Sequence, residues 1–271
     1  MLSEKVLLQE LSWPEVRDLQ AAKPVIIIPT GAIEQHGPHL PFEVDSRIAE
    51  KLAEAVARKV RPNVPILVTP VVSVGASGEH MSFPGTLSLS ADAFMVVARQ
   101  ILGCLIQHGF DHFFFLNGHG GNEEALKLVA RTVREEHEVI IAASSYWQLA
   151  REEIRSVRES PGGGMNHGGE EETSLMLFLR PDLVNMAVAE ANPLRWRSSY
   201  LAGDYAQDPP VTFGRKRSDI APMGHNGDPT LASGEKGRRL FEAIVEAVAH
   251  FVNEFHRWRL DQMTSADQEQ P

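Results

Sequence analysis

Four consecutive aliphatic residues, Val25-Ile26-Ile27-Ile28, stand directly before Pro29. A continuous apolar run of this length is typical of a strand that is buried on both faces, as in a parallel sheet. The chain contains three further runs of this kind: Ile66-Leu67-Val68 with Val71-Val72 beyond Pro70, His112-Phe113-Phe114-Phe115-Leu116, and Val139-Ile140-Ile141-Ala142. We expect each run to form a strand.

Amphipathic helical patterns separate these runs. Apolar residues recur at helical spacing in four series: Ile48, Leu52, Val56 and Val60; Phe94, Val97, Ile101 and Leu105; Leu126, Val129 and Val133; Leu240, Ile244, Val248, Phe251 and Phe255. Strands that alternate with helices predict an α/β fold whose mostly parallel sheet is covered by helices on both faces.

We expect one domain over residues 1–263, followed by a polar tail over residues 264–271. Residues 181–236 are the exception to the regular alternation, because they are rich in proline and have little periodicity. A long irregular stretch in a compact domain is usually functional or forms an oligomer contact. Trp196 and Tyr200 lie in it and are candidates for a pocket or an interface.

Composition excludes several classes of protein. The formal net charge of −10 argues against broad binding of nucleic acid, which needs basic patches. Cys104 is the only cysteine, so a disulfide scaffold is excluded, and its apolar neighbours predict a buried, inert thiol. No apolar run approaches the roughly 18 residues of a membrane span, and the first ten residues lack a signal-peptide core. We therefore expect a soluble, cytoplasmic protein without membrane partners.

Histidines gather in segments rich in glycine or proline, and three of these segments follow predicted strands. In α/β sheets, ligands bind in the loops beyond the carboxyl ends of the strands. The residues concerned are His36, His39, His80, His119 and His167.

Acidic residues accompany several of these histidines. Glu34 and His36 are two residues apart, so they point to one side of an extended backbone, although such a pair is also common on solvated surfaces. Asp45 stands at the start of a predicted helix, where a carboxylate also complements the helix dipole. The same alternative holds for Glu170 and Glu171, whereas Glu172 is followed at once by core-like residues.

His119 lies among three glycines directly after a predicted strand, in a turn that lets the backbone approach a ligand. The alternative is a plain turn with Asn122 as the N-cap of the next helix. The combined set of carboxylates and imidazoles, without thiolates, suits zinc, manganese or iron(II). Two ions that share one carboxylate would use all five members and could hold a bridging hydroxide: Glu34, His36, Asp45, His119 and Glu172.

Four motifs occur in the order found in the creatininase family of metal-dependent amidohydrolases, and the chain resembles that family. They are residues 31–41 (GAIEQHGPHLP) with Asp45, residues 79–89 (EHMSFPGTLSL), residues 117–122 (NGHGGN) and residues 167–176 (HGGEEETSLM). The resemblance extends from about Leu11 to the C-terminal helix.

The resemblance implies a three-layer α/β/α fold with a dinuclear metal centre, a small-molecule substrate and assembly into a homo-oligomer, often a hexamer. It implies that Glu34 and His119 hold one ion, that His36 and Glu172 hold the other, and that Asp45 bridges them. Zinc is favoured, with manganese or iron as alternatives. His167 corresponds to the family's non-ligand histidine, the catalytic acid/base.

The chain departs from the creatinine-hydrolysing members of that family. Those members carry an aromatic residue and a glutamate ligand where this chain has Gly120 and Gly121, and a Trp-Asp pair where it has Gly163 and Gly164. The stacking surface for a flat ring is missing, so creatinine is an unfavoured substrate.

The sequence thus predicts a metal-dependent hydrolase that cleaves a C–N bond of a small amide, a cyclic amide (lactam) or a formamide. Ser77, His80 and Gly120 are the candidate substrate-binding residues, although His80 could equally be a loop residue that bonds to the backbone. Alternatives within the family are a hydrolase of a keto-cyclitol ring and a peptidase that matures a peptide. A metal-binding assembly protein without catalytic activity is the alternative from another class.

Overall fold

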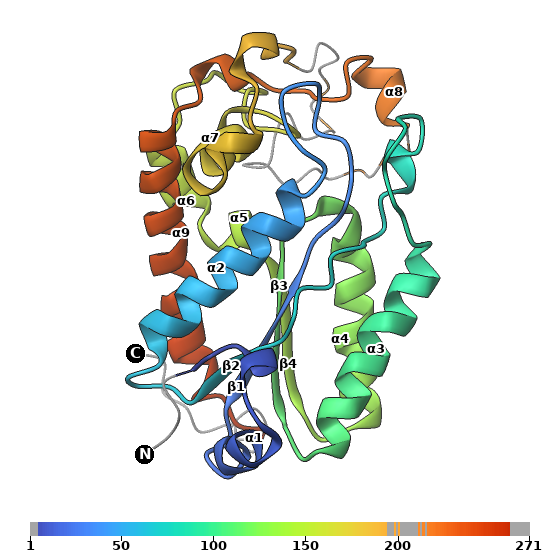
Figure 1. Ribbon diagram of the computed structural model, residues 1–271. Helices are drawn as coiled ribbons and strands as arrows, with labels where there is room; N and C mark the ends of the chain where they lie inside the picture. Colours follow the sequence, from blue (N-terminus) through green and yellow to red (C-terminus); the bar gives the residue numbers. More distant parts are fainter. Residues whose placement is uncertain are drawn as a thin grey trace.

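The computed structural model describes residues 5–193, 198, 200, 211, 213–214 and 216–260. Its centre is a four-stranded parallel sheet (Figure 1). The strands are β1 (Val25–Thr30), β2 (Ile66–Val68), β3 (His112–Asn117) and β4 (Ile140–Ser145), in the order β2-β1-β3-β4. Every residue of β1 and β3 is buried, as the continuous apolar runs predict.

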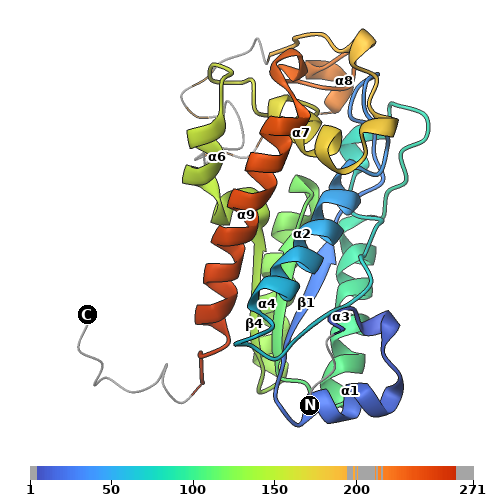
Figure 2. The ribbon, with the colours of Figure 1, turned by 60° about the vertical axis from the view of Figure 1, so that its left-hand side comes forward.

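Helices cover both faces of the sheet, so the predicted three-layer α/β/α fold is confirmed. Successive side chains of a strand point to opposite faces, so β1 sends Val25 and Ile27 into one core and Ile26 and Ile28 into the other. Helices α2 (Val44–Val60) and α9 (Gly234–Phe255) pack over the first face, and α3 (Ala91–Gln107) and α4 (Glu123–Glu136) over the second. Figures 1 and 2 show these two layers on either side of the strands.

Shorter elements complete the described fold. Helix α7 (Glu170–Leu179) packs along α9 and also contacts α2. The other elements are α1 (Trp13–Gln20), α5 (Tyr146–Leu149), α6 (Arg151–Val157), α8 (Arg217–Ile220) and the 3₁₀ turns η1 (Leu8–Glu10), η2 (Gly78–His80), η3 (Gly120–Asn122), η4 (Pro181–Leu183), η5 (Met186–Val188) and η6 (Pro229–Leu231).

The structure refines the prediction of the second strand and describes part of the irregular stretch. The second strand ends at Val68, and beyond Pro70 only an isolated bridge joins Val72 to Thr30. Tyr200 is exposed, whereas Trp196 and the predicted polar tail lie outside the described residues. Within the described residues, no helix is both long enough and apolar enough to span a bilayer.

The prediction of a buried thiol at Cys104 is wrong, because Cys104 is exposed. It lies on α3, where Leu102 and Leu105 turn inward. The neighbours of Cys104 along the sequence are apolar, but on a helix they are spread around the axis, so an apolar run does not fix the direction of any one member.

The strand order places the candidate site between β1 and β3. The helix after β1 lies on one face of the sheet and the helix after β3 lies on the other, so the loops that follow these two strands diverge. Ligands bind at such a switch point in open α/β sheets. Two glycines let the first turn of α2 approach both strand ends: a Cβ at Gly31 would lie 2.4 Å from the Ser46 Cα, and one at Gly118 would lie 2.6 Å from the Asp45 carbonyl oxygen.

Candidate metal centre

Three carboxylates from distant parts of the chain meet beyond the carboxyl ends of β1 and β3. Glu34 follows β1, Asp45 lies in the first turn of α2, and Glu172 lies in the first turn of α7. Each is at most 2% exposed. Burying a carboxylate costs free energy unless positive groups or hydrogen-bond donors surround it. The partners of these three carboxylates therefore indicate what the cluster can bind.

His36 lies against two of these carboxylates. Its Nε2 is 2.9 Å from Asp45 Oδ1 and 3.8 Å from Glu172 Oε2. Its other ring nitrogen, Nδ1, donates to the backbone carbonyl of Glu34 at 3.1 Å. Because a carbonyl oxygen only accepts, this bond places the hydrogen of the neutral ring on Nδ1, and the neutral ring would then face the carboxylates with its Nε2 lone pair.

His119 is oriented in the same way. Its Nδ1 lies 3.0 Å from Asp45 Oδ2 and 3.4 Å from Glu34 Oε2. Its Nε2 lies 3.2 Å from the carbonyl oxygen of Ala76 and 3.3 Å from the hydroxyl of Ser77. A carbonyl behind the ring fixes the tautomer that metal-ligating histidines adopt.

The geometry fits divalent cations. Three groups have ligand atoms that all lie within 4.8 Å of one another: Glu34 with Asp45 and His119, His36 with His167 and Glu172, and Glu34 with His80 and His167. The buried atoms Glu34 Oε2 and Asp45 Oδ2 have no hydrogen-bond partner in the described part of the chain. Unpaired buried oxygens beside inward-facing imidazole lone pairs are the arrangement that a cation would satisfy, and this set of oxygen and nitrogen donors suits zinc, manganese or iron(II).

The electrostatics of the cluster favour positive charge. Burial opposes protonation of His36, but Asp45, Glu172 and Glu34 outweigh it and raise its pKa to about 10. The same balance between burial and the carboxylates of Glu34 and Asp45 raises the pKa of His119 to about 9. Burial, opposed by His36, raises the pKa of Glu172 to about 7. Metal ions would compete with protons for these atoms.

His167 lies at the edge of the same cluster. Its Nε2 donates to the carbonyl of Gln35 at 2.7 Å, and its Nδ1 is 3.6 Å from Glu34 Oε1. Burial and the charges of His36 and Arg217 hold its pKa well below the usual value. His167 is therefore a neutral imidazole whose Nδ1 lone pair faces the carboxylates, at a distance suited both to accepting a proton and to binding an ion.

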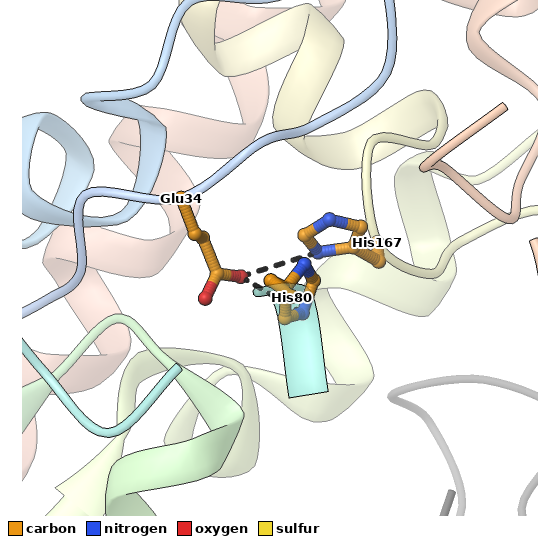
Figure 3. A group of neighbouring side chains, drawn as sticks. All are labelled: Glu34, His80 and His167. Atoms are coloured by element: carbon orange, nitrogen blue, oxygen red, sulfur yellow. Dashed lines mark ion pairs between the residues drawn. The ribbon is translucent and has the colours of Figure 1, made fainter. Parts of the chain in front are cut away.

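Figure 3 shows that His80 and His167 approach the carboxylate of Glu34 from the same side. The Nε2 of His80 lies 3.3 Å from Glu34 Oε1, and the two rings are 4.4 Å apart between centroids. His80 belongs to the 3₁₀ turn η2 and is fully buried. This placement puts His80 among the charged groups of the site.

The other two candidate substrate residues differ in their surroundings. Ser77 is fully buried and contacts His119, so it supports a candidate ligand. Gly120 is exposed, and a Cβ there would meet nothing within 4 Å. At Gly121, by contrast, a Cβ would lie 2.5 Å from His119 Nε2. The loop as folded therefore has no room for a glutamate ligand at position 121.

Sequence reasoning misjudged two of the acidic and amide residues around the site. Asn122 does stand at the N-cap of α4, but its side chain makes no cap bond and instead joins the backbones of Ala76 and Gly31. Glu170 does lie at a helix start, but it is fully buried and pairs with Lys236 at 2.5 Å. A helix-start pattern alone does not show which acids turn inward.

Sequence reasoning missed a set of residues that enclose the site. Gln35 is buried between the two motif residues Glu34 and His36, and its amide contacts His80. The segment 217–228 contributes the rest: Arg217 donates to Glu79, and the backbone of Asn226 donates to the carbonyl of His167. The turn-rich sequence around His225 was the available signal, since His225 is buried in this segment.

The chain is similar to known proteins over most of its length. The family model described as creatinine amidohydrolase matches residues 9–252. The chain is 33% identical over 261 residues to a mycofactocin precursor peptide peptidase of Mycobacterium ulcerans (strain Agy99), covering 93% of this chain and 92% of the relative.

Solved creatininases share the fold. A mutant creatininase of the Zn-Zn type and a creatininase named with Mn both superpose with a TM-score of 0.76 at 28% identity. In each case 94% of this chain and 100% of the other chain are covered. Since the family model matches most of the chain and the solved neighbours share its whole architecture, the chain belongs to the creatininase family of hydrolases.

Proposed function

We propose that the protein hydrolyses the C–N bond of an amide with the help of two divalent cations. One observation carries the proposal: Asp45 offers Oδ1 toward His36 and Oδ2 toward His119, so one carboxylate serves two neighbouring groups of ligand atoms. Glu34 completes the group of His119, and Glu172 completes that of His36. Zinc is favoured, with manganese or iron as alternatives.

A pair of divalent cations supplies Lewis acidity, which activates water and stabilises charge on a carbonyl oxygen. The chain supplies the proton transfers. The inward Nδ1 of His167 is unprotonated, because its Nε2 proton is held by the carbonyl of Gln35. His167 can therefore take a proton from the attacking water and pass it to the leaving nitrogen. Burial of the ring excludes bulk water from this transfer.

Within the amides, we favour a peptide substrate over a compact ring. The 33% identity to a peptidase of a precursor peptide supports this choice. The open space at Gly120 also supports it, because a Cβ at that position would meet no described atom within 4 Å and so leaves room for a larger substrate. Gly163 and Gly164 provide no aromatic or acidic group to hold creatinine.

The test is a substrate panel on protein loaded with zinc, manganese or iron(II). It contains short peptides, a formamide, a lactam, a keto-cyclitol and creatinine. We expect metal-dependent turnover of a peptide or another amide, and creatinine turnover at least 100-fold lower. Turnover of the keto-cyclitol alone would contradict C–N hydrolysis, and metal loading without turnover of any member would favour the non-catalytic alternative.

Location and assembly are further proposals. We propose that the protein is cytoplasmic and acts on a diffusible substrate. We also propose that it assembles as a homo-oligomer, with six copies by family resemblance. Light scattering of the purified protein measures the number of copies, and a monomer would contradict the assembly.

A further inference from the structure

Among the described residues, the imidazoles that face Glu34 and Asp45 differ in what stands behind the ring, and therefore in whether the inner ring nitrogen carries a hydrogen or a lone pair. His36, His119 and His167 each direct their outer nitrogen at a backbone carbonyl, at 3.1, 3.2 and 2.7 Å respectively. In the neutral form of these three rings, the form that binds a cation, the inner nitrogen carries the lone pair. His80 is the exception, because a side-chain amide stands where the other rings have a carbonyl.

That amide belongs to Gln35, whose orientation is fixed by its neighbours. The Gln35 Oε1 accepts from the backbone N–H of Gly37 at 3.0 Å. The Gln35 Nε2 donates to the carbonyl of Gly224 at 2.8 Å and lies 2.9 Å from His80 Nδ1. The same Nε2 lies 3.2 Å from His167 Nε2, but that nitrogen carries the hydrogen that it donates to the carbonyl of Gln35 and cannot accept another. One amide hydrogen serves Gly224, so the second is available for His80. The Nδ1 of His80 is thus an acceptor, and the hydrogen of the neutral ring is on Nε2.

The inner Nε2–H of His80 points at carboxylates. It lies 3.3 Å from Glu34 Oε1 and 3.2 Å from Glu79 Oε1. Arg217 Nη2 donates to the same oxygen of Glu79 at 2.6 Å and holds that carboxylate in place. The Nε of Arg217 also donates toward His80 Nε2, at 3.4 Å, and so competes for this nitrogen, but the contact is longer than either contact of Nε2 with a carboxylate oxygen. A ring nitrogen that carries hydrogen cannot bind a cation, but it can donate to a carboxylate.

We propose that Gln35 is a positioning residue that holds His80 as the Nε2–H tautomer, so that His80 donates to Glu79, presents a hydrogen to Glu34 and does not compete for a cation. With Oε1 of Glu34 facing this hydrogen, Oε2 is the oxygen that faces His119. The functional consequence of this tautomer rests on the hydrolysis proposed above, whereas the tautomer itself can be measured without any substrate.

The first test is ¹⁵N NMR of the full-length, zinc-loaded protein labelled at histidine, with His80 assigned by comparison with His80→Gln. We expect an unprotonated Nδ1 and a protonated Nε2. In Gln35→Glu the new carboxylate accepts from the ring, so the tautomer reverses. If Gln35→Glu does not fold, Gln35→Met removes the donor without adding an acceptor, and His80 then shows a mixture of tautomers.

A wild-type His80 with protonated Nδ1, or with both nitrogens protonated, would overturn the proposal. So would an unchanged tautomer in both Gln35 variants. Neither result depends on whether the substrate panel succeeds, so a failure of the proposed function is distinguished from a failure of this inference.

The second test measures kcat, KM and metal content on the best substrate of the panel. Partners that orient metal-site groups typically contribute about 10–100-fold, so we expect Gln35→Glu to lower kcat by that factor while KM changes little and the cations stay. The matched control is Thr86→Val, which removes the hydroxyl 3.3 Å from the backbone nitrogen of Gln35 and leaves the amide in place. It should keep the tautomer and kcat. A reversed tautomer with unchanged kcat would contradict the positioning role.

Discussion

The Oδ2 atom of Asp45 lies 3.0 Å from the Nδ1 atom of His119, yet Oδ2 has no hydrogen-bond partner among the described residues. Two buried atoms of this kind, close together and without a hydrogen bond between them, suit the shared coordination of one ion. The other oxygen of the same carboxylate faces His36 at 2.9 Å. The two halves of the centre are therefore joined through a single side chain, and this leads to the first prediction.

Replacing Asp45 with alanine should remove both cations, whereas wild-type protein binds about two per chain. Elemental analysis after dialysis measures the content. Asp92→Ala is the matched control, because Asp92 also lies in the first turn of a helix but is exposed. Full metal loading of Asp45→Ala would contradict the sharing of this carboxylate.

His167→Ala should keep the cations and lose most of the turnover. Positioned acid/base groups contribute about 10²–10⁴-fold, and the described geometry places the Nδ1 of His167 3.6 Å from Glu34 Oε1. Metal content, melting temperature and turnover are measured on one preparation. If the cations leave with the side chain, His167 is a ligand in the group that it forms with His36 and Glu172.

Metal binding should release protons, and affinity should rise with pH. The pKa of His36 is raised to about 10 and that of His119 to about 9, so both rings are protonated at pH 7.5 in metal-free protein. Ligation requires neutral imidazoles, so affinity falls as pH is lowered from about 9 to 6, most steeply where Glu172, with a pKa of about 7, also takes up a proton.

Calorimetry of zinc binding in buffers of different ionisation enthalpy counts these protons. We expect more than one proton per chain at pH 7.5. A binding enthalpy that is independent of the buffer would show that neither ring is protonated before the metal binds.

Lys236→Met should destabilise the fold by about 3–5 kcal/mol, because it leaves the buried carboxylate of Glu170 without its positive partner. Glu170 also accepts from the backbone N–H groups of Glu159 and Ser160, so it holds the start of α7 to α9 and to the end of α6. Urea unfolding measures the loss. The control Arg238→Met removes exposed ion pairs two residues further along α9 and should cost less than about 1 kcal/mol. Equal losses in the two variants would contradict the structural role of the buried pair.

Gly121→Ala should weaken metal binding, and Gly120→Ala should not. A Cβ at position 121 would lie 2.5 Å from His119 Nε2 and 2.3 Å from the Ala76 carbonyl oxygen, so it would disturb the bond that orients this ring. At position 120 a Cβ meets nothing. Competition with a chromogenic zinc chelator measures both affinities, and equal affinities would show that the loop relaxes around the added methyl.

The amino-acid sequence was enough to predict the layers of the fold and the edge of the sheet at which the site lies. A parallel strand that is buried on both faces needs a continuous apolar run, and a helix that covers a sheet needs one apolar stripe. The strands β1 and β3 and the helices α2 and α9 can therefore be predicted from local hydrophobic patterns. The carboxyl ends of parallel strands lie at one edge of the sheet, so the loops that hold Glu34 and His119 had to meet. Local composition also gave Glu172 an inward direction.

The contacts between individual atoms, by contrast, follow from tertiary packing. The tautomer of a histidine depends on what stands behind the ring, and for His80 that is Gln35, 45 residues away. The inward turn of Glu170 depends on Lys236, 66 residues away, and the exposure of Cys104 depends on which side of α3 packs on the sheet. Short sequence patterns carry periodicity and residue type, but hydrogen bonds between distant segments require coordinates, because their geometry is set by the packing of whole elements and not by neighbours along the chain.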